Sequence, residues 1–291
     1  MLKCYSDGAI EDQCRMRLEE IIMNNANCLF LAACAVLLAP CLHGQILVEN
    51  SAGVDIDGST NSAFAFDTGS NGDRALIVFV QARQFSPAFT PSVTSLQYDG
   101  QNLISLGSVS NTADSDAEVS VQMFYLLNPA SGSNSLSYDI QDTTRGISLG
   151  VVGLSAVEQS APTIFGSSNA SNGTSSSNTV SLTTTANNSL IVSGFAARDT
   201  NVTGTGFSST TTQPSGSPNN SGSGGSQLAG AFGTQLVSTA GNTDVTWSWS
   251  SGAEANAQFA VAFAPIPEPG TAVLALSGLG MILAFGRRRR R

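Results

Sequence analysis

Beyond residue 44 this chain has no cysteine, no histidine and no lysine. All five cysteines, the single histidine (His43) and the single lysine (Lys3) of the 291 residues come earlier. The later chain therefore cannot form a disulfide framework, a thiolate nucleophile, a zinc site with Cys or His ligands, or a Ser-His-Asp triad. Without lysine it also lacks a Schiff-base residue and the lysine contact of a P-loop. These absences exclude most hydrolase and transferase chemistries, and we expect a protein that is not an enzyme and needs no cofactor, calcium aside.

Positive charge is also scarce. Residues 45–265 contain four arginines against fifteen acids, a balance of −11. Such a surface repels phosphate backbones, so we expect no nucleic-acid partner. The remaining polarity comes from Ser, Thr, Asn and Gly, a composition typical of exported β-rich proteins and of surfaces that bind carbohydrate more readily than charged ligands.

The C-terminal end combines three features in a fixed order. The triplet Pro267, Glu268, Pro269 comes first, and an uncharged apolar run over 272–285 follows it. An apolar run satisfies its backbone in a bilayer only as a helix, and a basic cluster stays on the cytoplasmic side. A span of roughly 14 to 16 residues reaches only about 21 to 24 Å, short of the roughly 30 Å of hydrocarbon, which suits a segment that is removed. The basic cluster that stops the chain in the membrane is Arg287, Arg288, Arg289, Arg290 and Arg291.

This arrangement resembles the PEP-CTERM sorting signal of exported bacterial proteins. The resemblance covers 266–291, with the motif at 266–271, a transmembrane helix at 272–286 and the arginine cluster at 287–291. It implies that an exosortase, a membrane cysteine transpeptidase or protease, cuts near the triplet after transient anchoring in the inner membrane. The product would then lie at the outer surface or in the extracellular matrix, usually in organisms that make extracellular polysaccharide. The alternative is an ordinary single-pass tail anchor with a proline-rich stem.

The N-terminal end predicts export. A short apolar run over 28–42, followed by a polar turn, has the length of a signal-peptide hydrophobic region. We expect a signal peptide over 23–44 that is cleaved after Gly44 or Gln45. Residues 1–22 are interpreted as the result of a start codon assigned too early, or as an unusual N-terminal extension. The letters of 31–34 match a lipoprotein cleavage box, but apolar sequence continues beyond Cys34 and favours the ordinary signal peptide.

Between the two ends, residues 45–265 have the period of β-strands. Apolar and polar residues alternate over 119–125, 136–140 and 245–249, and the continuous apolar run 75–81 is typical of a strand buried on both faces. Asp99-Gly100 marks a tight hairpin turn. No stretch shows a helical period over three turns, so we expect one all-β ectodomain.

The ectodomain also repeats. Residues 73–83 recur as 188–198 at an offset of 115, and 126–140 align with 235–249 at an offset of 109. We therefore predict one two-sheet antiparallel sandwich of roughly ten to twelve strands, built from two similar halves, beside an N-terminal signal helix and the short C-terminal transmembrane helix. The pattern resembles lectin-like or jelly-roll sandwich modules of bacterial surface proteins. The alternative to a true internal repeat is that the two halves resemble each other only because β-hairpins share a similar composition.

Two groups of acids at alternate positions are candidate calcium ligands, because an extended loop could turn several carboxylate oxygens to one side. Neither group completes an EF-hand loop, and solvated acids at turns and strand starts are the simpler interpretation of both groups. The candidate ligands are Asp55, Asp57, Asp114, Asp116 and Glu118.

Three classes of function remain. The favoured one is a non-enzymatic structural or adhesive component of the cell surface or matrix. A carbohydrate-binding module is the second, with Trp247 and Trp249 either as a sugar platform or as core. The third is a glycan-cleaving enzyme, with Asp139 and Asp142 or Asp244 and Glu254 as its carboxylate pair.

Overall fold

The computed structural model describes residues 44–56, 61–84, 92–114, 117–141, 146–160, 163–170, 177–198, 206–207, 219–221, 228–248 and 255–266. All of them belong to one compact unit, His43–Ile266. They form seventeen strands and no helix, and three of the strands are only two or three residues long. The all-β prediction is confirmed, with more strands than the ten to twelve expected. The predicted signal helix and transmembrane helix lie outside the described residues, and within the described ranges no helix has the length and apolarity to cross a membrane.

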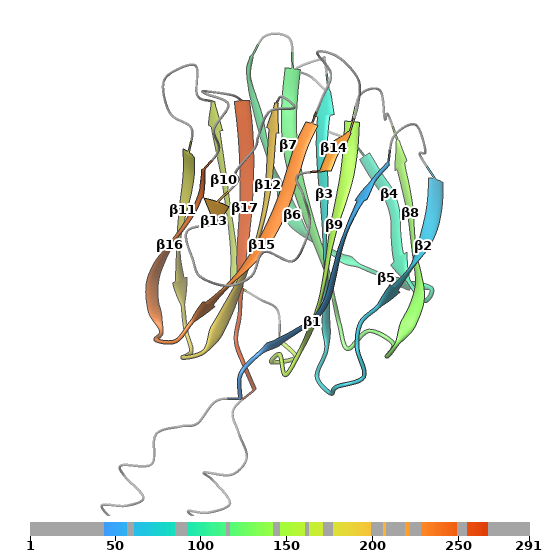
Figure 1. The fold of residues 1–291 in the computed structure, drawn as a ribbon, viewed down its shortest axis with the longest axis vertical. Coiled ribbons are helices and arrows are strands. Elements are labelled where there is room, and N and C mark those ends of the chain that lie inside the picture. Colours follow the sequence, from blue (N-terminus) through green and yellow to red (C-terminus); the bar gives the residue numbers. More distant parts are fainter. Residues whose placement is uncertain are drawn as a thin grey trace, which may run out of the picture. The chain divides into compact units, whose positions relative to one another are not determined.

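Two five-stranded antiparallel sheets form the centre of the unit (Figure 1). In inner sheet I the order is β1 (Leu47–Asp55), β9 (Gly146–Ser155), β3 (Ala75–Gln84), β7 (Ala117–Leu127) and β6 (Ile104–Asp114). In inner sheet II it is β10 (Thr163–Ala170), β17 (Ala255–Phe263), β12 (Ser189–Arg198), β15 (Leu228–Val237) and β14 (Asn219–Ser221).

A smaller sheet covers the outer face of each inner sheet, at the right and left in Figure 1. Outer sheet I contains β2 (Asn61–Asp67), β8 (Ser133–Gln141), β4 (Ser92–Tyr98) and β5 (Gln101–Asn102). Outer sheet II contains β11 (Ser177–Thr184), β16 (Gly241–Ser248) and β13 (Gly206–Phe207).

The two halves of the chain build these sheets in the same way. Each inner sheet has the same order of strands when β1, β9, β3, β7 and β6 are matched to β10, β17, β12, β15 and β14. The repeated sequences 73–83 and 188–198 contain the central strands β3 and β12, and both repeats begin with a residue at positive φ, Asp73 at 51° and Asn188 at 58°. The similarity read from the sequence is therefore a repeated supersecondary unit.

The layering differs from the single two-sheet sandwich that we expected. Four sheets stack, so there are three hydrophobic cores instead of one: a central core between the inner sheets and one outer core in each half. The reason lies in strands such as β3, where Ile77 and Phe79 enter the central core and Leu76 and Val78 enter an outer core. A strand that is apolar on both faces needs cover on both sides, which a two-sheet sandwich does not supply.

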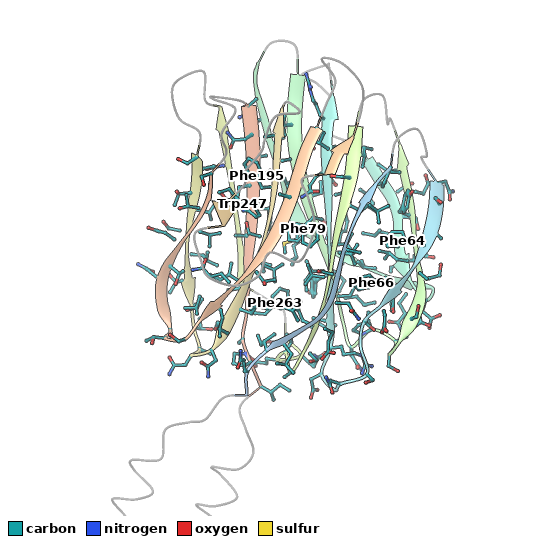
Figure 2. All side chains as sticks on the ribbon, viewed as in Figure 1. Phe64, Phe66, Phe79, Phe195, Trp247 and Phe263 are labelled. Atoms are coloured by element: carbon teal, nitrogen blue, oxygen red, sulfur yellow. The ribbon has the colours of Figure 1, made fainter. Side chains whose placement is uncertain are left out.

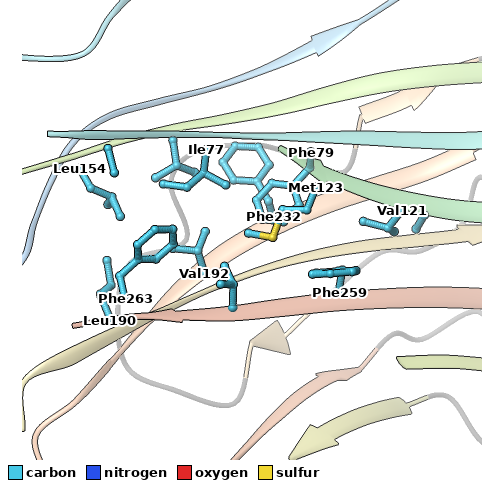
Figure 3. Packing of buried hydrophobic residues seen from close by; sticks show 14 of the residues in the cluster. Ile77, Phe79, Val121, Met123, Leu154, Leu190, Val192, Phe232, Phe259 and Phe263 are labelled. Carbon is cyan, nitrogen blue, oxygen red and sulfur yellow. The ribbon is translucent and has the colours of Figure 1, made fainter. Parts of the chain in front are cut away.

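Side chains of unequal size interlock in the central core (Figure 3). Phe79 of β3 lies over Gly194 of β12, where an added Cβ would come within 2.2 Å of the ring. Phe232 of β15 likewise lies over Gly150 of β9, at 2.5 Å from a built Cβ. Phe79 and Gly194 hold the same position in the two repeats. The halves are alike in topology but complementary in shape where they meet.

Polar side chains also cross the central core. The amide of Gln81 on β3 donates from Nε2 to the carbonyls of Phe195 (3.1 Å) and Ala231 (2.6 Å) on inner sheet II. Its Oε1 accepts a bond of 2.8 Å from Oγ of Ser148. Gln81 is buried, and a buried amide is tolerated only when its donors and acceptors are satisfied. This contact therefore favours one alignment of the two inner sheets.

Candidate functional site

The end of the folded unit adjoins the predicted sorting motif. β17 stops at Phe263, and the chain continues extended through Ala264, Pro265 and Ile266. Pro265 forms an antiparallel bridge with Val157. The carbonyl of Ala264 accepts from Glu158 N (2.9 Å), and Ile266 N donates to the carbonyl of Ala156 (3.3 Å). We call residues 264–266 the closing segment.

The wall that receives the closing segment is itself fixed. It follows β9, which is buried along its whole length. The N–H of Ala156 donates to the carbonyl of Gly72 (3.2 Å), and that of Val157 donates to the carbonyl of Asp73 (3.0 Å). Val157 is fully buried in the central core. Ala156 has φ of 58°, a left-handed conformation that turns the chain out of β9 and along the closing segment.

The start of the described chain meets the same place. Gly44 N donates to the carbonyl of Ile266 at 3.2 Å, and two residues later Ile46 is buried in the central core. β1 then pairs with β9 from Leu47 onward. The polypeptide therefore enters and leaves the folded unit side by side, at the lower end in Figure 1.

Polar side chains hold the adjacent turns. Oε1 of Glu49 accepts from Nδ2 of Asn71 (2.6 Å) and from the hydroxyl of Ser155. Arg74 donates from Nη1 to the carbonyl of Asn71 (2.6 Å) and from Nη2 to the carbonyl of Pro129 (2.9 Å). These bonds tie β1, the turn before β3 and the turn after β7 together, which makes this end a built platform for the closing segment.

The candidate calcium ligands lie at the other end of inner sheet I. Asp55 ends β1 and Asp114 ends β6, the two edge strands, so four strand spacings, roughly 19 Å, separate their backbones. Glu118 lies near the start of β7; Asp57 and Asp116, and the side chains of all five acids, lie outside the described residues. Among the described residues no group of three or more His, Cys, Asp or Glu side chains comes together. Calcium binding stays a prediction for two separate groups of acids, one at the end of β1 and one around the turn between β6 and β7.

The structure describes one of the two candidate tryptophans, Trp247. Trp247 on β16 is fully buried in the outer core of the second half, and its ring stacks on Phe195 with centroids 5.6 Å apart (Figure 2). Its indole Nε1 donates to Oγ of Ser193 at 3.0 Å. Trp247 is therefore core and not a sugar platform, while Trp249 lies outside the described residues. Buried tryptophans of this kind take a hydrogen-bond partner for the indole N–H.

The candidate carboxylate pairs are each described in one member only. Asp139 lies on β8 and Asp244 on β16, on separate outer sheets, while Asp142 and Glu254 lie outside the described residues. Oδ1 of Asp244 accepts a hydrogen bond of 2.5 Å from Oγ of Ser181. The separation that glycoside hydrolysis requires stays undetermined for both pairs.

The solvent face of outer sheet II is a ladder of small polar side chains. Between β11 and β16, Thr179 pairs with Thr246 at 2.8 Å, and Oγ1 of Thr183 donates to Oδ1 of Asn242 at 2.5 Å. Ser181 and Asp244 form the rung between them. Among the described residues the exposed large apolar side chains are Leu47, Val48 and Ile104, none of them aromatic.

The comparisons with known proteins point to the C-terminal end. Residues 265–291 match the PEP-CTERM protein-sorting motif. The match begins at Pro265, so it includes two residues of the closing segment. The boundary at 266 that we expected from the sequence left out Pro265, the residue that bridges to Val157. The alternation of Phe259, Val261 and Phe263 continues to Pro265, and this signal could have shown that the strand runs into the motif.

The sorting residues Pro267, Glu268 and Pro269, and the cluster Arg287–291, lie outside the described residues. No curated protein and no solved structure matched the chain. The PEP-CTERM signal indicates export and sorting to the cell envelope, and it implies exosortase-dependent processing.

Proposed function

We propose that this protein is an exosortase substrate whose folded unit acts as a non-enzymatic structural or adhesive component at the outer surface or in the extracellular matrix. Transient anchoring by the C-terminal helix precedes the cut. The observation that carries the proposal is the direct continuity of the sorting motif with the closing segment: the motif begins inside the last bridge of a folded β unit.

The architecture supports a passive role. Three stacked cores bury side chains along the whole unit without any cysteine beyond residue 44. Gly44 and Ile266, the two ends of the described chain, lie at one end of the folded unit. The acidic balance of 45–265 keeps such a unit soluble and discourages binding to anionic polymers.

Fractionation of the native host tests this proposal. Wild-type protein should lose its tail and appear in the outer envelope fraction or the medium. A variant with Pro267→Ala, Glu268→Ala and Pro269→Ala should keep its tail and stay in the inner membrane. The matched control replaces Ser238 and Thr239, in the exposed turn after β15, with alanine and should be processed like wild type. Wild-type protein with an intact tail, or found in the cytosol, contradicts the proposal.

Carbohydrate binding is a second candidate, and extracellular polysaccharide is the partner it names. The ladder of hydroxyl and amide groups on outer sheet II favours it, because these groups hydrogen-bond to sugars without a charge requirement. Retention on polysaccharide gels and glycan arrays test it. Thr179→Val with Thr246→Val should weaken retention, whereas Thr94→Val on outer sheet I is the control. Release of reducing ends that Asp139→Asn or Asp244→Asn abolishes would instead support a glycan-cleaving enzyme.

A further inference from the structure

The closing segment is both the end of the fold and the beginning of the sorting motif. Pro265 and Ile266 belong to the matched motif, and Pro267 follows them directly in the sequence. Five residues, 267–271, separate Ile266 from the start of the predicted membrane helix. No spacer therefore stands between the folded wall and the residues that the processing enzyme must reach.

The backbone groups of the closing segment are already paired. The carbonyl of Ala264 accepts from Glu158 N, and the N–H of Ile266 donates to the carbonyl of Ala156. Pro265 has no N–H, and its side chain is buried. An exosortase that binds its substrate as an extended strand would compete with the domain for these groups.

The competition cannot be relieved by movement of the wall. Ala156 and Val157 are hydrogen-bonded to the turn at Gly72 and Asp73, and Val157 is fully buried. The closing segment can detach from the wall, because the folded unit ends at Ile266.

From this geometry we infer that the pairing of residues 264–266 with 156–158 is a gate that limits the rate of exosortase cleavage. The enzyme acts on the population in which the closing segment is detached. The inference rests on the proposed processing and names its regulation, while the peptide-bond cleavage itself belongs to the exosortase.

Two changes open the gate by different means. A flexible spacer of five Gly and Ser residues between Ile266 and Pro267 moves the triplet Pro267, Glu268 and Pro269 up to about 17 Å along the chain from the wall. Glu158→Pro removes the N–H that donates to Ala264, at an exposed position where Val157 is already extended. Losing one net backbone hydrogen bond should raise the detached population by about fivefold.

The experiment is a pulse-chase of the full chain in the native host, following the loss of the tail by its change in mass. The controls are the same spacer inserted after Ala240, in another exposed turn, and Ser160→Pro, two residues beyond the wall. Protease resistance of the ectodomain confirms that each variant folds.

The expected result is that Glu158→Pro shortens the half-time of processing about fivefold and the Ile266 spacer also shortens it, while both controls match wild type. Equal half-times for all proteins overturn the gate and leave the proposed function intact. A faster spacer variant beside an unchanged Glu158→Pro also overturns it, because distance and not pairing is then limiting. Absence of processing in every protein, wild type included, overturns the proposed function and the gate with it.

Discussion

Replacing Gly194 by alanine tests the complementary packing of the two halves. The added Cβ would lie 2.2 Å from Cδ1 and 2.7 Å from Cε1 of Phe79, closer than carbon atoms approach in proteins. Phe79 is fully buried, and its ring stacks on Phe232 with centroids 6.4 Å apart, so the ring cannot move outward into solvent. The substitution therefore forces a shift of the inner sheets or a strained rotamer.

The magnitude follows from two opposing effects. Overpacking a well-packed core costs about 1 to 3 kcal/mol. Replacing a strand glycine with alanine returns roughly 0.5 to 1 kcal/mol, because the unfolded chain loses freedom. The net expectation is a loss of about 1 to 2 kcal/mol in the free energy of unfolding, measured by urea denaturation of the processed ectodomain.

A double-mutant cycle isolates the contact. Phe79→Ala alone should cost about 3 to 5 kcal/mol by leaving a cavity. In that background Gly194→Ala meets no ring and should be neutral or stabilising, a coupling of about 2 kcal/mol. Gly72→Ala is the matched control, since an added Cβ there has no heavy atom within 4 Å. Additive effects, or a Gly194→Ala variant as stable as wild type, would refute the interlocking of the two halves.

Three further predictions test the layers and the acids. Trp247→Ala should lower the free energy of unfolding by about 3 to 5 kcal/mol, since it removes the ring that stacks on Phe195, with Trp247→Phe intermediate by the same denaturation assay. Gln81→Leu should cost about 1 to 3 kcal/mol, because two buried carbonyls lose their donor, and Gln97→Leu on an outer sheet should be near neutral. Calcium should raise the thermal midpoint and chelator should lower it if the acids bind the ion; an unchanged midpoint in calorimetry removes calcium from the account.

Much of the local structure follows from the residues alone. The alternation along 245–249 predicts β16 with Val245 and Trp247 on one face, and both side chains are buried. Asp99-Gly100 predicts a tight turn, and both residues have positive φ. The repeat of 73–83 at 188–198 predicts two equivalent strands, which are the centres of the two inner sheets. Periodicity and turn chemistry are local properties, so single positions carry them.

The candidate site depended partly on sequence and partly on structure. The order of triplet, apolar run and arginines is a linear signal, and it predicts the sorting motif without a fold. The pairing of the closing segment with Ala156 and Gly44 joins residues more than a hundred positions apart, and no local pattern marks it. The burial of Trp247 was also open, because a strand has two faces and sequence does not say which is covered.

Periodicity determined that the described residues are all-β, and the order of triplet, apolar run and arginines determined that the chain carries a sorting signal that indicates export. The tertiary structure alone decided that four sheets stack around three cores, that Phe79 meets Gly194, and that the sorting motif begins inside the last bridge. The physical reason is that strand pairing and sheet stacking are chosen by contacts between distant residues, whose shapes must fit together in space.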